Sequence, residues 1–206
     1  MSSSVQRPRV RKSPAARRAE IVDAAAAVAL TEGLECVTLR RIGDDLGVRP
    51  GLISHYFPSA EELVAEAFGS AASGELDALL PGADDSPVRR LAGFLGRTTG
   101  EEYDAISRLW INARHLSRYR PALRDRVAEQ EAAWRGRLEG LIREGVERGE
   151  FRTPDPSVTT VQILVVLDGL SVHANTDTSG HPTAVTRMAH AMAERELGLA
   201  EGALST

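Results

Sequence analysis

One stretch of the chain, residues 38–57, combines hydroxyl and basic side chains with the apolar spacing of two short helices. Thr38 is a suitable N-cap for the first helix, and Gly47 ends it because glycine readily adopts the left-handed conformation of a sharp turn. Pro50 fits the first turn of a second helix. Two short helices at a steep angle place the second one in the DNA major groove, so the pattern predicts a helix-turn-helix. The apolar positions of the first helix are Leu39, Ile42 and Leu46.

Two longer helices are predicted to position this motif. An alanine-rich helix over residues 15–31 lies directly upstream, and two helices of about seven residues need such a support to bury a core. Downstream, Ser59 and Glu62 have the spacing of a capping box and predict a helix over residues 59–80. Because no linker precedes Ser59, this helix should join the motif rigidly to the rest. The predicted domains are 15–58 and 59–206.

The remaining sequence predicts only helices, because its β-branched residues never alternate as in a strand. The helix after Pro156, to about residue 174, is apolar all round and must be covered on both faces. One face can meet the core. The last helix, 183–197, is placed to help the other face bind a second copy of the chain. Further helices are predicted over 86–98, 102–117 and from Pro121 to about Gly145, so the fold class is all-α.

Charge is distributed unevenly. Residues 1–58 carry nine Lys or Arg against six Asp or Glu, a net +3, whereas residues 59–206 carry sixteen against twenty-three, a net −7. A basic end on an acidic body suits a protein with one DNA-facing end. Residues 1–14 are predicted to form a disordered basic arm. Two interpretations of this arm stay open: a solvated tail, or a segment that reaches phosphates or a minor groove.

Several protein classes are disfavoured. The single cysteine excludes an intramolecular disulfide and fits a reducing cytoplasm. The uninterrupted apolar runs are much shorter than the roughly 18–20 residues of a membrane span. The five histidines show no metal-binding spacing, and no nucleophile elbow, phosphate loop or dinucleotide fingerprint occurs. We therefore expect no enzyme, no metal, no cofactor and no membrane partner.

The motif resembles the tetracycline-repressor (TetR) family of transcriptional regulators. The residues that carry the resemblance are Thr38, Ile42, Gly47, Val48, Gly51, Tyr56, Phe57, Ser59 and Leu63. Within that family, the segment Gly51–Phe57 is similar to the choline-responsive repressors of betaine synthesis, and Trp110, Pro121 and the segment Leu167–Leu170 are loosely similar to their C-terminal half. The resemblance implies a nine-helix homodimer, joined through its last two helices, that binds a palindromic operator in double-stranded DNA and is released by a small molecule.

Roles carried over from the family give a predicted DNA-contacting set. These residues are Thr38, Arg40, Arg49, Gly51, Ser54, His55 and Tyr56. Two positions depart from the family pattern, because Arg49 replaces a common serine and Ala60 replaces a common lysine. One helix cap and one phosphate contact are therefore lost. Arg49 is able to read guanine with two hydrogen bonds, which predicts a G-containing half-site.

A ligand pocket is predicted from Trp110, Trp134 and Asp168, which could hold an organic cation through ring faces and one charge. The alternative is that both tryptophans only pack in the core and that Asp168 has a structural partner such as an arginine. The effector's identity stays unknown. The competing function is a helical interaction protein whose basic arm binds acidic partners without sequence-specific DNA binding.

Overall fold

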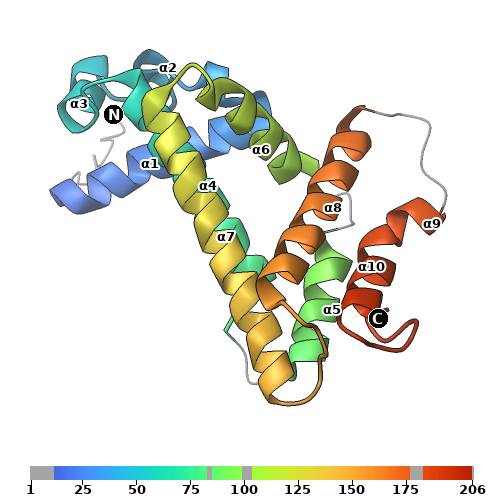
Figure 1. The fold of residues 1–206 in the computed structure, drawn as a ribbon. Helices are drawn as coiled ribbons and strands as arrows, with labels where there is room; N and C mark the ends of the chain where they lie inside the picture. The colour runs from blue at the N-terminus through green and yellow to red at the C-terminus, as the bar shows by residue number, and fades with distance from the viewer. Residues whose placement is uncertain (1–11, 83–84, 99–103, 177–182, 206) are drawn as a thin grey trace, which may run out of the picture.

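The computed structural model describes residues 12–82, 85–98, 104–176 and 183–205, and within them every regular element is a helix. The all-α fold class is therefore confirmed. Helices α1, α2 and α3 form one end of the molecule, while α8 and α10 lie side by side at the other (Figure 1). The elements are α1 Pro14–Glu32, the 3-10 turn η1 Leu34–Cys36, α2 Leu39–Asp45, α3 Pro50–Tyr56, α4 Ala60–Leu79, α5 Pro87–Arg97, α6 Asp104–Ser117, α7 Pro121–Glu147, α8 Pro156–Thr176, α9 Thr183–Thr186 and α10 Met188–Glu196.

The first three helices begin and end where local chemistry requires. The Thr38 hydroxyl accepts the N–H of Arg41 at 3.1 Å and caps α2. Gly47 has φ +61°, in the left-handed region, and opens the turn before Pro50 starts α3. The predicted helix-turn-helix is thus present, and α1 supports it. The core of this module consists of Ile21, Ala25, Ile42, Ile53 and Phe57, all at most 1% exposed.

Helix α4 joins the module to the rest of the chain and packs along both α1 and α7. Ser59 caps it by accepting the N–H of Glu62 at 3.1 Å. The predicted capping box is only half formed, because the Glu62 carboxylate accepts from the Ser59 hydroxyl at 3.4 Å rather than from a backbone N–H. The cap nevertheless starts the helix directly after the motif, so α4 is a continuous connection.

The second half of the chain packs around the long helix α7. Its apolar stripe is buried as predicted, and Trp134 from this stripe lies 6.1 Å from the Phe94 ring and 6.5 Å from the Trp110 ring. The Phe68 ring of α4 meets Trp110 edge-on at 5.0 Å. These aromatic contacts tie α4, α5, α6 and α7 into one core.

Helix α8 has two different apolar faces, as its sequence predicted. Ile163 and Leu167 are buried against the core, whereas Val165 on the other face is 63% exposed. By length and composition α8 could also cross a membrane. In this structure α8 packs on α6, α7 and α10. It also carries a charged residue, Asp168, which pairs with Arg114 of α6. The apolar outer face is therefore a surface that needs another cover.

Some boundaries differ from the expectations. The helix predicted over 183–197 is divided at Arg187 into α9 and α10, so the described residues contain ten α-helices rather than nine. Most of the predicted arm, residues 1–11, lies outside the described residues. At its end Ser13 caps α1 and the Lys12 ammonium pairs with Glu20 at 2.6 Å, so this part of the expected arm is already ordered.

Candidate nucleic-acid interface and ligand cavity

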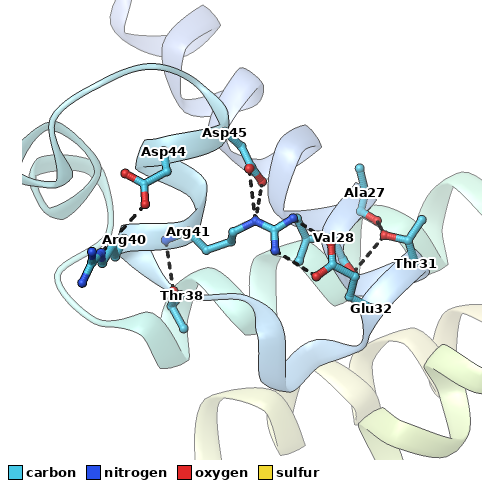
Figure 2. Close-up of polar contacts among 9 residues, drawn as sticks. All are labelled: Ala27, Val28, Thr31, Glu32, Thr38, Arg40, Arg41, Asp44 and Asp45. Carbon is cyan, nitrogen blue, oxygen red and sulfur yellow. Dashed lines mark hydrogen bonds and ion pairs between the residues drawn. The ribbon is translucent and has the colours of Figure 1, made fainter.

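Two neighbouring arginines on α2 point in opposite directions (Figure 2). The Arg41 guanidinium donates to both oxygens of Glu32, at 2.7 and 2.8 Å, and to Asp45 at 3.0 Å. The hydrogen bonds that Arg41 donates to Glu32, and then those that it donates to Asp45, raise the pKa of Arg41 further above its ordinary value. Arg40, in contrast, is 87% exposed and its nearest acid, Asp44, is 3.9 Å away. Arg41 therefore clamps α2 to the end of α1, while the Arg40 side chain extends into solvent with only a long ion pair to Asp44.

The start of α2 carries the exposed hydroxyl group of Thr38, one of the predicted DNA-contacting residues. The Thr38 oxygen accepts the Arg41 N–H and thereby fixes the side chain. Its own hydroxyl hydrogen makes no bond in the described structure and is available to an acceptor. Because the helix N-terminus is also the positive end of the helix dipole, an anion is favoured at this position.

Helix α3 presents one polar face to solvent and one apolar face to the core. Ile53 and Phe57 are buried, whereas the side of the helix that carries Ser54 and His55 is exposed. Arg49 precedes the helix and makes no side-chain cap, and its side chain is exposed to solvent. The Ser54 hydroxyl donates to the Pro50 carbonyl at 3.2 Å, which leaves its oxygen as an acceptor.

The rest of the predicted DNA-contacting set lies on the same turn and helix. Gly51 is exposed, and a Cβ there would meet no atom within 4 Å, so the backbone can be approached closely. Tyr56 is half-buried at the end of α3, with its ring edge-on to His55 at 5.3 Å. The fold thus brings all seven predicted residues to the α2–α3 end of the molecule.

A cavity of about 170 Å³ lies between α6, α7 and α8. It brings together Trp110, Trp134 and Asp168, the three residues predicted to form a ligand pocket. Both tryptophans are also largely buried, at 8% and 6% exposure, so they serve as core and as cavity wall at once. The other lining residues are Ser107, Ile111, Arg114, Glu131, Arg135, Val161, Leu164, Val165, Leu167 and Ser171.

An arginine of the chain itself occupies the position expected for a ligand cation. The Arg114 guanidinium carbon lies 5.1 Å from the centre of the Trp110 ring. Its nitrogens donate to Asp168 at 3.0 Å and to Glu131 at 2.9 Å. Burial lowers the pKa of Arg114, but the charges and hydrogen bonds of Asp168 and Glu131 outweigh it and raise the pKa overall. Asp168 therefore has the arginine partner that the alternative interpretation required.

The two indole N–H groups of the cavity differ in their partners. The Trp110 N–H donates to the Glu75 carboxylate at 2.8 Å. The Trp134 N–H is buried and has no acceptor within the described part of the chain. A buried donor without a partner costs roughly 1–3 kcal/mol, and because the Trp134 N–H is screened from solvent, a ligand would reach it only if neighbouring side chains moved.

Helix α6 connects the cavity wall to the helix-turn-helix. One side of α6 carries Trp110 and Arg114, and Asn112 points instead to η1, the turn that leads into α2. The Asn112 side-chain oxygen accepts the N–H of Leu34 at 2.9 Å, and its amide donates to the Glu35 carboxylate at 2.8 and 2.9 Å. Asn112 therefore links the cavity-lining helix α6 to the backbone just before the motif.

A second connection runs through α4 and α7. Glu66 of α4 accepts from Arg18 of α1 at 3.3 Å and from Arg126 of α7 at 2.5 Å. The Arg18 guanidinium also lies 4.9 Å from the Phe57 ring, at the end of the motif. Arg126 lies on the same helix as Trp134. A continuous series of contacts therefore links α7, which lines the cavity, to Phe57 at the end of the motif.

Sequence reasoning missed four residues of these sites, and three had a signal. Arg114 follows Trp110 by four residues, which places a cation over a ring on one helix face. Glu131 precedes Trp134 by three and lies on the same face. Arg41 precedes Asp45 by four, the spacing of a helical ion pair. Asn112 had no signal, because its partners in η1 are distant in the sequence. Among the described residues, no three His, Cys, Asp or Glu side chains are grouped as a metal ion would need.

Comparison with protein families gives two matches. Residues 21–67 match the model of bacterial regulatory proteins of the TetR family, and residues 88–198 match the model of the BetI-type transcriptional repressor, C-terminal part. The chain is also 30% identical over 161 residues to the HTH-type transcriptional repressor KstR2 of Mycobacterium tuberculosis, an alignment that covers 70% of this chain and 74% of that protein.

Solved structures share the fold. A TetR-family transcriptional regulator from Rhodococcus sp. superposes with a TM-score of 0.75 at 24% identity and covers 89% of this chain and 99% of its own. A transcriptional regulator from Saccharomonospora viridis, solved with choline, gives 0.69 at 21% identity over 86% and 94%. The family matches, together with the capped helix-turn-helix and its exposed polar face, establish that the chain belongs to the TetR family of DNA-binding transcriptional regulators.

Proposed function

We propose that this protein acts in the cytoplasm as a repressor, that a homodimer binds a palindromic operator, and that a small molecule in the α6–α8 cavity releases it. The observation that supports the proposal is that the two neighbouring arginines of α2 have different surroundings: Arg41 is held in ion pairs, and Arg40 is exposed. The Arg41 clamp fixes the helix to α1, so Arg40 and the polar face of α3 are presented from a rigid base. Side chains that read nucleobase edges in the major groove need such a rigid support.

A gel shift against the DNA upstream of the protein's own coding sequence tests this proposal. Specific retention at physiological salt is expected of a repressor, because specific binding exceeds non-specific binding by roughly 10³–10⁷. The competing interaction protein would show only salt-labile retention that ignores sequence. This second outcome would contradict the proposed function.

Arg49 is proposed to read a guanine in each half-site. Its guanidinium is exposed beside the start of α3, where it does not cap the helix. Replacement of Arg49 by Ala should weaken binding by about 1–3 kcal/mol per good base contact and relax the preference at one position of each half-site. Equal weakening for every sequence would show that Arg49 contacts phosphate instead.

The effector is proposed to enter the cavity between α6, α7 and α8. The tryptophan ring faces and the carboxylates of the cavity favour an organic cation as the class of effector. The S. viridis relative was solved with choline, so choline is one compound to test. In this chain Arg114 already occupies that position, so a cation must displace it. An uncharged apolar molecule would leave Arg114 in place. Thermal shift distinguishes them, because a ligand of the native state raises the melting temperature.

Two routes are proposed to carry the effector signal. Through α6, displacement of Arg114 would pull on Asn112 and the η1 turn. Through α7, the Glu66 pairs would move α4, the helix that holds the motif at its start. Because the separation of two recognition helices must match the half-site spacing, a shift of a few ångströms suffices for release.

A further inference from the structure

The outer face of α8 is a stripe of exposed valines. They follow one another at intervals of three, four and seven residues, which keeps them on one side of the helix. Val165, near the centre, is 63% exposed, and Met188 of the adjacent α10 is 46% exposed. We call this surface the valine stripe: Val158, Val161, Val165 and Val172.

Two members of the valine stripe also line the cavity. Val161 and Val165 belong to its wall together with Trp110, Arg114 and Trp134. The cavity therefore opens along the same apolar surface that faces solvent in a single chain. Val158 and Val172 lie outside the wall, so a small ligand in the cavity cannot cover the stripe by itself.

We propose that the valine stripe of a second copy closes this cavity, so that the ligand site is complete only in the dimer. The inference rests on the proposed effector cavity. A second copy is the occupant that fits, because the side chains of the stripe are uncharged and α10, which packs on α8, exposes Met188 as well. Two identical apolar surfaces of this kind can pack against each other about a two-fold axis. TetR-family repressors bind DNA as dimers, which supplies such a copy.

Asp168, a charged group beside the stripe, is already paired within the subunit. Asp168 follows Val161 by seven residues and so lies at the edge of the same face. Arg114 pairs with it at 3.0 Å, also from the cavity wall. Two Asp168 carboxylates brought together at a two-fold interface would repel each other, but each is partly compensated by Arg114, which Asp168 shares with Glu131. The Arg114 pair therefore makes this face compatible with a symmetric partner.

Closure by the partner couples ligand binding to dimer formation. A ligand that touches both subunits binds the dimer more tightly than the monomer, and it must strengthen the dimer by the same factor. Such a ligand also changes the packing of α8 against α8 of the second copy. This packing sets the distance between the two α3 helices in the dimer. The interface is thus part of the effector site.

The test is to break the dimer without touching the cavity wall. The variant V158E/V172E places two charges on the valine stripe at exposed positions outside the wall. The matched control A133E/G140E places two charges on the exposed face of α7, opposite Glu131 and Trp134. N-phenyl-1-naphthylamine, an uncharged dye that fluoresces in apolar sites, is the probe. Sedimentation gives the oligomeric state and circular dichroism the helix content.

We expect the stripe variant to be a folded monomer that binds the dye roughly tenfold more weakly than wild type, within the 5–150-fold range of typical coupling. The control should stay dimeric and bind like wild type. A folded monomer with wild-type dye affinity, or a stripe variant that stays dimeric, would overturn the inference. Failure of the wild-type dimer to bind the dye at all, with its tryptophan fluorescence unchanged, would overturn the inference and count against the proposed effector cavity too.

Dilution of the wild-type protein gives a second measurement in case the stripe variant does not fold. Dye affinity should fall over the same protein concentrations at which sedimentation shows the dimer dissociating. Saturating dye should shift that dissociation to lower concentration by the factor by which dye affinity differs between dimer and monomer. Dye affinity that stays constant across the dissociation would overturn the inference.

Discussion

The two ends of the molecule expose opposite kinds of surface. The α2–α3 end offers Arg40 and Arg49 from short helices whose caps and ion pairs fix them in place. The α8 end offers an uncharged row of valines from one long helix. A charged exposed end is suited to DNA, where affinity falls with salt, and an apolar end is suited to a protein partner. The contrast shows how one chain separates its two binding tasks.

The ends also differ in how they are held together. In the α1–α3 module, polar bonds such as Arg41 with Glu32 set the geometry around a small core. At the other end, close packing of apolar side chains sets the geometry. The surroundings of Gly145 show how tight this packing is. A Cβ at Gly145 would overlap the ring of Phe151, which is 1% exposed at the turn between α7 and α8.

The largest effect on stability is expected from Gly145→Ala, which breaks only the apolar end. The added methyl group collides with the Phe151 ring and should lower the free energy of unfolding by about 2 kcal/mol or more. Urea denaturation measures it. The control Gly136→Ala lies on the same helix, exposed and with no atom within 4 Å, and should instead stabilise by up to about 1 kcal/mol. Equal effects of the two variants would show that the α7–α8 turn is not tightly packed.

The second prediction separates the ends by salt. Replacement of Arg40 by Ala removes one phosphate contact per subunit, so the slope of log K against log salt for operator binding should fall by about 1.8 for the dimer. Dimerisation of wild type, which we assign to the valine stripe, should hardly respond to salt. Fluorescence anisotropy and sedimentation give the two quantities. A dimer as salt-sensitive as the DNA complex would show that charged groups, and not the valine stripe, hold the two subunits together.

The third prediction concerns the clamp that gives the DNA end its rigidity. Glu32→Gln removes one charge from the bidentate Arg41 pair, and its half-exposed position limits the loss of stability to about 1 kcal/mol. We expect operator affinity to drop severalfold and non-specific DNA affinity to stay level or rise. Asp23→Asn, an exposed acid on the same helix outside the clamp, is the control. If both variants raised specific and non-specific affinity alike, the clamp would have no positioning role.

The smallest effect is a pH dependence at the α10 side of the apolar end. Burial lowers the pKa of His190 below its usual 6.5, while the charge of Glu194 acts to raise this pKa and that of Arg187 to lower it. The unfolded chain therefore takes up this proton first, and stability is lost as pH falls below about 6.5. His190→Gln should flatten the dependence between pH 7 and 5.5. Above pH 8 the free energies of unfolding of wild type and variant should change with pH in parallel. Curves with the same pH dependence over the whole range would exclude this role of His190.

The sequence predicted the DNA end more completely than the ligand end. Capping by Thr38 and the turn at Gly47 are local, so periodicity and residue type located them within a few residues. All seven predicted DNA-contacting residues lie on that end. Their individual contacts with DNA stay predictions, which the Arg40 and Arg49 variants test.

The cavity could be predicted only in part. Trp110, Trp134 and Asp168 do meet, but the partner that fills their midst, Arg114, was not foreseen, although its spacing from Trp110 was visible. Asn112 was hidden because its contact with Leu34 joins residues far apart in the chain. The split of the last helix at Arg187 was also missed, since its apolar positions keep a helical spacing on both sides of the break.

Selection of bound duplexes from a randomised DNA library measures operator recognition by the dimer, because the selected duplexes themselves reveal the operator sequence. We expect enrichment of two-fold symmetric sites whose half-site centres lie about one helical turn, roughly 10 bp, or a multiple of it apart. Each half-site should contain a guanine whose enrichment disappears with Arg49→Ala. Recovery of no shared sequence, or of sites without symmetry, would show that the protein does not read DNA as a dimer through α3.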